Sequence, residues 1–178
     1  MGTPLTQYFV ASTLDGFIAD EHDDLTWLFQ FSGPGSTYDD FIADVGAIAM
    51  GATTYRWILD NVDGPWPYPD QPSWIFTHRD LPVAEGGDVR FTQEPVAEVH
   101  AAMRAAAGDR NIWLVGGGDL VGQFLDHGLL DQIQVTVMPV LLGKGAPLLP
   151  RRRTTPMRLT STVPSTDQTS VHLVYAVG

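Results

Sequence analysis

The chain has 178 residues, a formal net charge of −11 and no cysteine. This length fits one domain over residues 1–178, and the lack of cysteine excludes disulfides, thiolate zinc sites and cysteine nucleophiles. The acidic charge argues against a nucleic-acid partner, because phosphate backbones need a basic surface. Residues 1–7 lack a secretion-signal pattern, no apolar run reaches about 18 residues, and the histidines show no ligand spacing. We therefore expect a cytoplasmic protein without membrane or metal sites.

Apolar, β-branched runs bounded by turn residues predict the strands, and apolar positions three to four residues apart predict the helices. The predicted strands are residues 7–12, 47–50, 74–77, 89–91, 112–115, 132–140, 157–163 and 170–177. The predicted helices are residues 37–44, one that begins at Gly51, residues 95–107 and one that contains residues 120–125. Early strands that alternate with helices indicate an α/β domain, and we expect the last strands to form an antiparallel meander.

Polar residues mark the start of the first predicted helix. Ser36 or Thr37 is expected to be its N-cap, with Asp39 and Asp40 in its first turn. Residues 61–72 are rich in proline and glycine and are expected to form an ordered surface loop.

Two predicted helices begin at glycines that directly follow buried strands. Gly51 follows one strand, and Gly116, Gly117 and Gly118 follow another. Glycine lets a ligand approach the main chain closely, and a helix N-terminus adds about half a positive charge, which suits a diphosphate. The alternative is a pair of tight turns that bind nothing. A Rossmann domain is not favoured, because no acidic residue ends a strand about twenty positions later.

A third strand ends in Thr77, His78 and Arg79, which offer a hydroxyl, an imidazole and a guanidinium group. The carboxyl ends of parallel strands meet at one edge of a sheet, so all three features are expected to line one cleft. Two phosphate-binding helix starts and an arginine suit NADPH better than NADH, because arginine binds a 2′-phosphate through two hydrogen bonds.

Four segments, in the correct order, resemble the dihydrofolate-reductase-like superfamily, and specifically the reductase domain of bacterial riboflavin-biosynthesis deaminase-reductases. They are VASTLDGFIA at residues 10–19, MGATTY at 50–55, VGGGDL at 115–120 and MPVLLGKGAPL at 138–148. The resemblance covers nearly the whole chain. It implies a dihydrofolate-reductase-like three-layer sandwich, with a mixed, mostly parallel sheet, antiparallel C-terminal strands and helices on both faces. No deaminase zinc motif is present, so the resemblance is to a stand-alone reductase domain.

The resemblance also implies how NADPH binds. Its phosphates would lie between Gly51, Ala52, Thr53 and Thr54 on one side and Gly116, Gly117, Gly118, Asp119 and Leu120 on the other. Thr77, His78 and Arg79 would hold the adenosine 2′-phosphate, and Ala11 and Ile18 would lie beside the nicotinamide. Ala52 stands where dihydrofolate reductases often carry a phosphate-binding arginine, so Arg79 would have to supply that charge.

The catalytic groups are less clear from the residues. Hydride transfer belongs to the coenzyme, and the protein supplies orientation and a proton donor. The resemblance makes Asp15 and Asp40 the candidate catalytic acids: dihydrofolate reductases carry a carboxylate on the helix that here contains Asp40, and Asp15 matches a turn of the riboflavin branch that faces the substrate pocket. Asp15, Trp27 and Trp66 are the candidate substrate-binding residues. The alternatives are a turn residue for Asp15, a solvated helix charge for Asp40 and core packing for the two tryptophans.

The glycine junctions, the end of the third strand and the resemblance together predict an NADPH-dependent reductase that acts on a small heterocyclic or carbonyl substrate. The resemblance names 5-amino-6-(5-phosphoribosylamino)uracil reductase as the activity to test. A phosphoribosyl substrate needs several cations, and only Lys144 and residues 151–153 offer them. The alternatives are a dihydrofolate or pterin reductase and a dinucleotide-binding module without turnover.

The apolar stretch of residues 135–149 carries four leucines beyond its strand. One domain of this size would struggle to cover them, so we expect a homodimer joined through the last strands and residues 139–150. The alternative is a loop that folds back over its own sheet.

Overall fold

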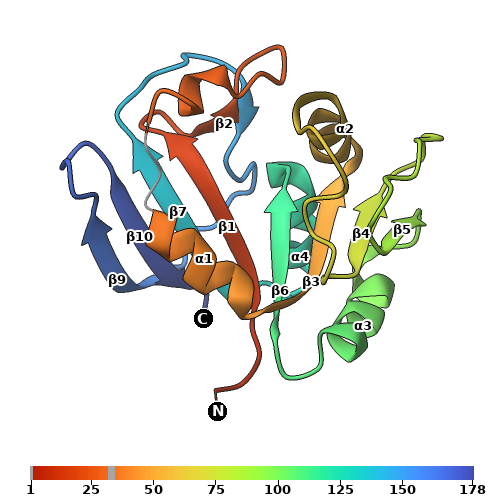
Figure 1. Cartoon of the computed structure of the whole chain (residues 1–178). Helices are drawn as coiled ribbons and strands as arrows, with labels where there is room; N and C mark the ends of the chain where they lie inside the picture. Colours follow the sequence, from red (N-terminus) through yellow and green to blue (C-terminus); the bar gives the residue numbers. More distant parts are fainter. Residues whose placement is uncertain (1, 32–34) are drawn as a thin grey trace.

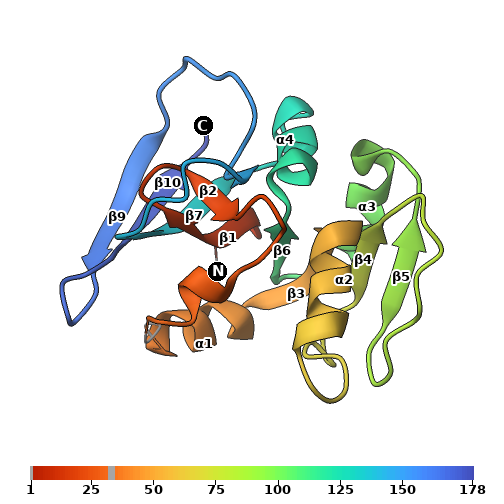
Figure 2. The same cartoon turned by 90° about the horizontal axis from the view of Figure 1, so that it is seen from above.

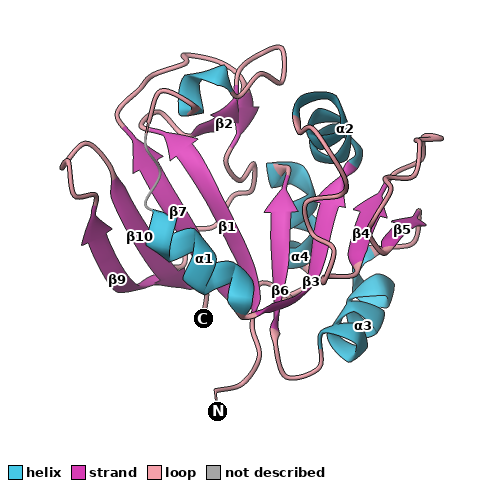
Figure 3. Ribbon diagram, viewed as in Figure 1, coloured by secondary structure: helices cyan, strands magenta, loops and turns pink. Residues whose placement is uncertain are grey.

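The computed structural model describes residues 2–31 and 35–178. Its main sheet has eight strands in the order β5-β4-β3-β6-β1-β7-β10-β9, and β2 pairs with β8 beside it (Figures 1 and 3). The strands are β1 Thr6–Thr13, β2 Phe17–Ala19, β3 Val45–Gly51, β4 Ser73–Phe76, β5 Val89–Thr92, β6 Asn111–Gly116, β7 Gln132–Met138, β8 Ala146–Pro147, β9 Arg158–Pro164 and β10 Val171–Ala176. Neighbouring strands from β5 to β7 run parallel, whereas β10 is antiparallel to β7 and β9. The predicted mixed sheet with antiparallel C-terminal strands is confirmed.

Helices cover both faces of the sheet, as expected. They are α1 Gly35–Ala43, α2 Ala52–Asn61, α3 Val96–Ala107 and α4 Gly118–Asp126, with a short 3-10 helix, η1, at Thr26–Leu28. Figure 2 shows α1 and α2 on one face and α3 and α4 on the other. One core cluster joins α3 and α4 to the sheet, and the second joins α1 and α2 to its opposite face. In the part of the chain that the structure describes, no helix is long and apolar enough to cross a membrane.

The last strands do not form the predicted meander. The chain passes from β7 to β9 and then to β10, yet β10 lies between the other two. Leu173 and Tyr175 of β10 stand opposite Val135 and Ile133 of β7, so the more apolar strand takes the inner position. All seven positions of β9 are exposed or half-buried, which suits a sheet edge.

The predicted start of the first helix is also wrong. The helix α1 begins at Gly35, so Ser36 and Thr37 lie within it and neither is the N-cap. Its first turn contains no acidic residue, and Asp39 and Asp40 therefore come later in the helix. Phe41 packs into the core, and burying such a ring contributes more than the roughly 1 kcal/mol of a side-chain cap. Tertiary packing therefore sets the position of this helix.

The strands β1 and β6 separate toward their carboxyl ends. They pair only from Thr6 with Ile112 to Tyr8 with Leu114, whereas β1 stays paired with β7 as far as Thr13. Side chains beyond Tyr8 and Leu114 can therefore line a space between the two strands.

Candidate active site

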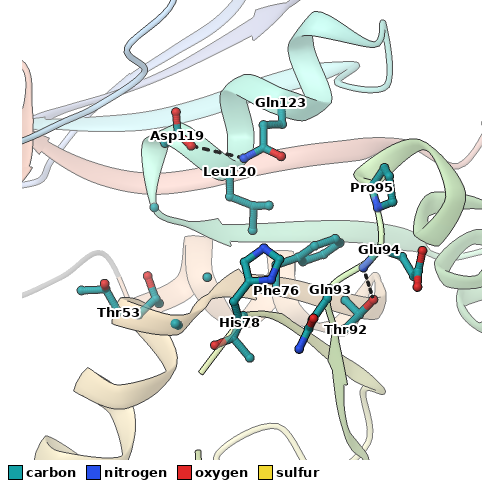
Figure 4. A pocket seen from close by; sticks show the side chains of 15 residues that line it. Thr53, Phe76, His78, Thr92, Gln93, Glu94, Pro95, Asp119, Leu120 and Gln123 are labelled. Atoms are coloured by element: carbon teal, nitrogen blue, oxygen red, sulfur yellow. Dashed lines mark hydrogen bonds between the residues drawn. The ribbon is translucent and has the colours of Figure 1, made fainter. Parts of the chain in front are cut away.

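A cavity of about 560 Å³ lies at the carboxyl ends of β3, β4, β5 and β6 (Figure 4). We call it the β4–β5 cavity. It brings together both glycine junctions and the end of β4, as the sequence predicts. Its lining residues are Gly51, Ala52, Thr53, Thr54, Phe76, Thr77, His78, Thr92, Gln93, Glu94, Pro95, Gly117, Asp119, Leu120 and Gln123.

A second cavity, of about 430 Å³, lies where β1 and β6 separate. We call it the β1–β6 cavity. Its lining residues are Val10, Ile18, Ala19, Asp23, Leu25, Thr53, Thr54, Trp57, Ile58, Tyr68, Trp113, Val115, Gly116, Gly117, Gly118, Asp119, Ala146, Pro147 and Pro150. Thr53, Thr54, Gly117 and Asp119 line both cavities, so the two spaces meet at the glycine junctions. One elongated ligand can therefore occupy both.

Two helix N-termini face this meeting point. Gly51 is the N-cap of α2 and Gly117 is the N-cap of α4, both with extended backbone and neither with a side-chain hydrogen bond to the first turn. The first N–H groups of a helix have no partner within the helix, so they remain available to an anion. This arrangement suits a diphosphate between α2 and α4.

The consecutive glycines at the start of α4 have different reasons to be glycine. A β-carbon on Gly118 would lie 2.5 Å from the carbonyl oxygen of Pro147 and 2.6 Å from that of Leu148, so the fold needs glycine there. A β-carbon on Gly117 would meet nothing within 4 Å, and its φ of −74° suits any residue. Gly117 lines both cavities, so close approach of a ligand explains this glycine better than packing does.

Arg151 reduces the negative charge beside the start of α4. Its guanidinium donates to Asp119 Oδ1 at 3.0 Å and to Asp126 Oδ2 at 2.7 Å, and Gln123 also donates to Asp119 (Figure 4). These bonds, led by the one from Arg151, lower the pKa of Asp119. An anion at the helix start therefore faces a carboxylate that is already paired.

The end of β4 places its three polar residues differently. Thr77 and His78 line the β4–β5 cavity, and the imidazole of His78 extends into it (Figure 4). Thr77 is buried, and its hydroxyl accepts the backbone N–H of Arg79 at 2.9 Å. Arg79 itself lines an adjoining hollow, and Thr77 lines both this hollow and the β4–β5 cavity. His78 is thus the only Lys, Arg or His side chain among the described residues that line the β4–β5 cavity.

The two candidate acids line neither of these cavities. Asp15 accepts hydrogen bonds from the Thr13 hydroxyl at 2.6 Å and from the backbone N–H groups of Gly143, at 2.7 Å, and Leu142. The Thr13 hydroxyl, together with these N–H groups, lowers the pKa of Asp15. This carboxylate fixes the loop before β8, as a turn residue would.

Asp40 is exposed on α1 and lines a different cavity, with Gln7, Asp44 and His172 among its neighbours. The stacked rings of Phe9 and Phe41, with Trp113 packed edge-on to both, lie between this part of α1 and the β1–β6 cavity. A catalytic role for Asp15 or Asp40 stays a prediction that the geometry does not support.

The two tryptophans that were predicted to bind substrate, Trp27 and Trp66, line neither cavity. Trp66 is only 3% exposed and donates from Nε1 to Ser73 Oγ at 3.1 Å, so it is a core residue and not a pocket wall. Trp27 is half-buried in η1 and lines neither cavity. Ile18 lines the β1–β6 cavity as predicted, whereas the residue of β1 that lines it is Val10, next to Ala11.

Four polar or aromatic residues that line the β1–β6 cavity were not identified from the sequence: Asp23, Trp57, Tyr68 and Trp113. Trp57 had a usable signal, because it follows Thr53 and Thr54 by one helical turn in α2. Asp23 and Tyr68 arrive on loops, for which no local pattern exists.

Tyr68 is the only tyrosine among the described residues that line the β1–β6 cavity. Burial, and then the neighbouring phenol of Tyr38, raise the pKa of Tyr68. Its phenol therefore stays protonated at neutral pH, and it shares a hydrogen bond with the Tyr38 phenol.

The chain is similar to several known proteins. A family model described as the RibD C-terminal domain matches residues 66–173. The uncharacterized protein YwjB of Bacillus subtilis is 33% identical over 96% of this chain and 98% of its own length. The crystal structure of a putative riboflavin biosynthesis protein from Shewanella sp. PV-4 has a TM-score of 0.81 at 24% identity, with 97% and 98% of the two chains covered.

A dihydrofolate reductase from Enterococcus faecalis, solved with NADP(H) and RAB-propyl, shares the fold. Its TM-score is 0.67 at 16% identity, and 97% of this chain and 95% of that chain are covered.

Proposed function

Because the chain belongs to the family of RibD C-terminal domains, we propose that it is a reductase that binds NADPH across both cavities. In this proposal a small heterocyclic substrate would bind in the β1–β6 cavity, beside the reactive end of the coenzyme. The observation that carries the proposal is the pair of uncapped helix N-termini, at Gly51 and Gly117, where the two cavities meet. The Enterococcus dihydrofolate reductase, which has the same fold, was solved with NADP(H).

Each part of the site has a task in this proposal. The first turns of α2 and α4 hold the diphosphate through backbone N–H groups, and Thr53 and Thr54 border it from α2. Thr77 and His78 border the adenosine end. When bound, the coenzyme supplies the hydride, while the aromatic and aliphatic side chains of the β1–β6 cavity exclude water and orient the acceptor. Tyr68 and Asp23 line the same cavity and would be the polar side chains beside that acceptor.

Oxidation of NADPH tests this proposal, followed by its absorbance with a panel of uracil, pterin and nitroaromatic acceptors. Turnover of 5-amino-6-(5-phosphoribosylamino)uracil would establish the riboflavin-type activity, and turnover of a pterin would establish the alternative reductase. Tight NADPH binding without turnover of any acceptor would favour a dinucleotide-binding module. No binding of NADPH at all would contradict the proposal.

Arg79 is proposed to select NADPH over NADH from the hollow beside the β4–β5 cavity. A charge-assisted bidentate contact contributes about 1.5–3 kcal/mol, so Arg79→Ala should weaken NADPH binding by about 10- to 150-fold. Binding of NADH should change little, because it lacks the 2′-phosphate. Calorimetric titration with both coenzymes measures this.

The control for that experiment is Arg56→Ala, which removes an exposed guanidinium whose partner is Asp60 on α2. It should leave both coenzyme affinities unchanged. An equal loss of NADPH and NADH affinity in Arg79→Ala would show a structural role for Arg79 instead.

We also propose that the protein forms a homodimer through β9 and the loop before β8. Part of the apolar stretch that suggested this folds back: Leu148 and Leu149 pack against the core, and Leu148 N–H donates to the Gly16 carbonyl. Leu141 remains 70% exposed, and Leu159 and Val163 on the edge strand β9 are 49% and 46% exposed. An unpaired edge strand with exposed apolar side chains favours a second copy.

Light scattering at micromolar concentration should give about twice the chain mass of 19.4 kDa. Val163→Asp on β9 should reduce this to the monomer mass, because it places a charge in the interface. Val83→Asp is the matched control, since Val83 is 65% exposed and lies on the loop between β4 and β5 instead of on β9. If the unmodified protein has the monomer mass throughout the micromolar range, the dimer proposal is wrong.

A further inference from the structure

The β1–β6 cavity has no cationic side chain among the described residues that line it. Its carboxylates belong to Asp23 and Asp119, and that of Asp119 already accepts hydrogen bonds from Arg151 and Gln123. Lys144, in the loop before β8, pairs with Glu21 and does not line the cavity. A phosphate in this cavity would therefore meet the Asp23 carboxylate, and no cationic side chain among the described lining residues offsets the repulsion.

The helix N-termini do not solve this problem for a second anion. Gly117 lines both cavities and Gly118 lines the β1–β6 cavity, so the start of α4 lies where the coenzyme diphosphate would bind in the proposed function. A substrate that binds beside the coenzyme has only the remaining lining residues, and these are largely apolar.

Aromatic side chains give the cavity flat, fixed walls. Trp113 donates from Nε1 to the Phe9 carbonyl at 3.1 Å, and Tyr68 packs against its indole edge-on at 5.4 Å between ring centroids. Trp57 lines the cavity from α2. Rings held in this way favour a planar ligand, which they can contact over a whole face.

Asp23 is held at this cavity by its backbone. It adopts a φ of +61°, in a turn where the Asp20 carboxylate accepts the N–H groups of His22 at 2.7 Å and Asp24 at 2.9 Å. An ionised carboxylate only accepts hydrogen bonds, so its ligand partner must be a donor. Asparagine also tolerates positive φ, which makes Asp23→Asn a substitution that the turn can accommodate.

Building on the coenzyme binding proposed above, we propose that this cavity takes a planar, unphosphorylated heteroaromatic ring whose N–H groups donate to Asp23. A phosphoribosyl substrate is disfavoured, although the family name points toward riboflavin synthesis. This separates the substrate class of this chain from that of reductases acting on 5-amino-6-(5-phosphoribosylamino)uracil.

The test compares 5-amino-6-(5-phosphoribosylamino)uracil with the same compound after enzymatic removal of its phosphate, and with a pterin. Each is titrated by calorimetry into the full chain saturated with NADP⁺, which prevents turnover. We expect the phosphate-free uracil to bind at least about tenfold more tightly than the phosphorylated one, because of the unpaired Asp23 charge. Equal or tighter binding of the phosphorylated compound would overturn the proposal, as would a failure of all three probes to bind.

Asp23→Asn should weaken binding of the phosphate-free uracil by at least about fivefold and strengthen binding of the phosphorylated compound, so the two affinities converge. Asp63→Asn, at an exposed acid after α2 that does not line the cavity, should change neither. Unchanged affinities in Asp23→Asn would remove Asp23 from the site.

The NADP⁺ titration that precedes these measurements separates the proposed function from the proposed substrate class. If NADP⁺ fails to bind, both proposals are overturned. If NADP⁺ binds and the phosphorylated compound is preferred, only the substrate class is overturned.

Discussion

Replacing Gly117 by valine is expected to weaken NADPH binding by about 30- to 150-fold while the protein remains folded. The new side chain would project into the space where the two cavities meet, since a β-carbon there has no protein atom within 4 Å. The coenzyme diphosphate would then have to move away from the N–H groups of α4, at a cost of about 2–3 kcal/mol. Calorimetric titration with NADPH, with circular dichroism to verify folding, measures this.

Two further variants make the Gly117 result specific. Gly118→Ala places its β-carbon against the carbonyl oxygens of Pro147 and Leu148, so it should lower the thermal midpoint instead. Ala105→Val, at an exposed position of α3 that lines neither cavity, should alter neither binding nor folding appreciably. If a folded Gly117→Val variant bound NADPH normally, the diphosphate would not lie at this junction.

Trp66→Ala should lower the free energy of unfolding by about 3–5 kcal/mol, as large-to-small substitutions of buried aromatic residues do. The indole of Trp66 is 3% exposed, packs against Tyr55 at 5.3 Å between ring centroids and hydrogen-bonds Ser73. Most domains are stable by only about 5–15 kcal/mol, so this loss is a large part of the total. Urea denaturation of the variant and the unmodified protein gives the difference.

Trp57→Ala is the informative comparison for Trp66. Trp57 is half-buried on α2 and lines the β1–β6 cavity, so its removal should cost less stability and more affinity for a ring-shaped substrate. The opposite pattern, with Trp66→Ala stable but defective in substrate binding, would restore Trp66 as a pocket wall.

The sequence alone determined the fold class and the meeting of the two glycine junctions at one cavity. Gly51, Thr53 and the 116–118 glycines belong to strand–turn–helix junctions, where local residue type dictates the backbone and the apolar runs dictate burial. Parallel strands then bring such junctions to one edge regardless of the details of packing. For this reason the β4–β5 cavity contains the end of β4 and both glycine junctions together.

The lining of the β1–β6 cavity was decided only by the tertiary structure. Asp23 and Tyr68 reach the β1–β6 cavity on loops, and Val10 and Val115 line it because β1 and β6 separate beyond Tyr8 and Leu114. Trp66, from a loop rich in proline and glycine, enters the core, and Asp15 fixes a loop more than a hundred residues away in sequence. The position of β10 between β7 and β9 likewise follows from which strand buries more apolar surface. Contacts between distant segments set these outcomes, and no local pattern of residue types records them.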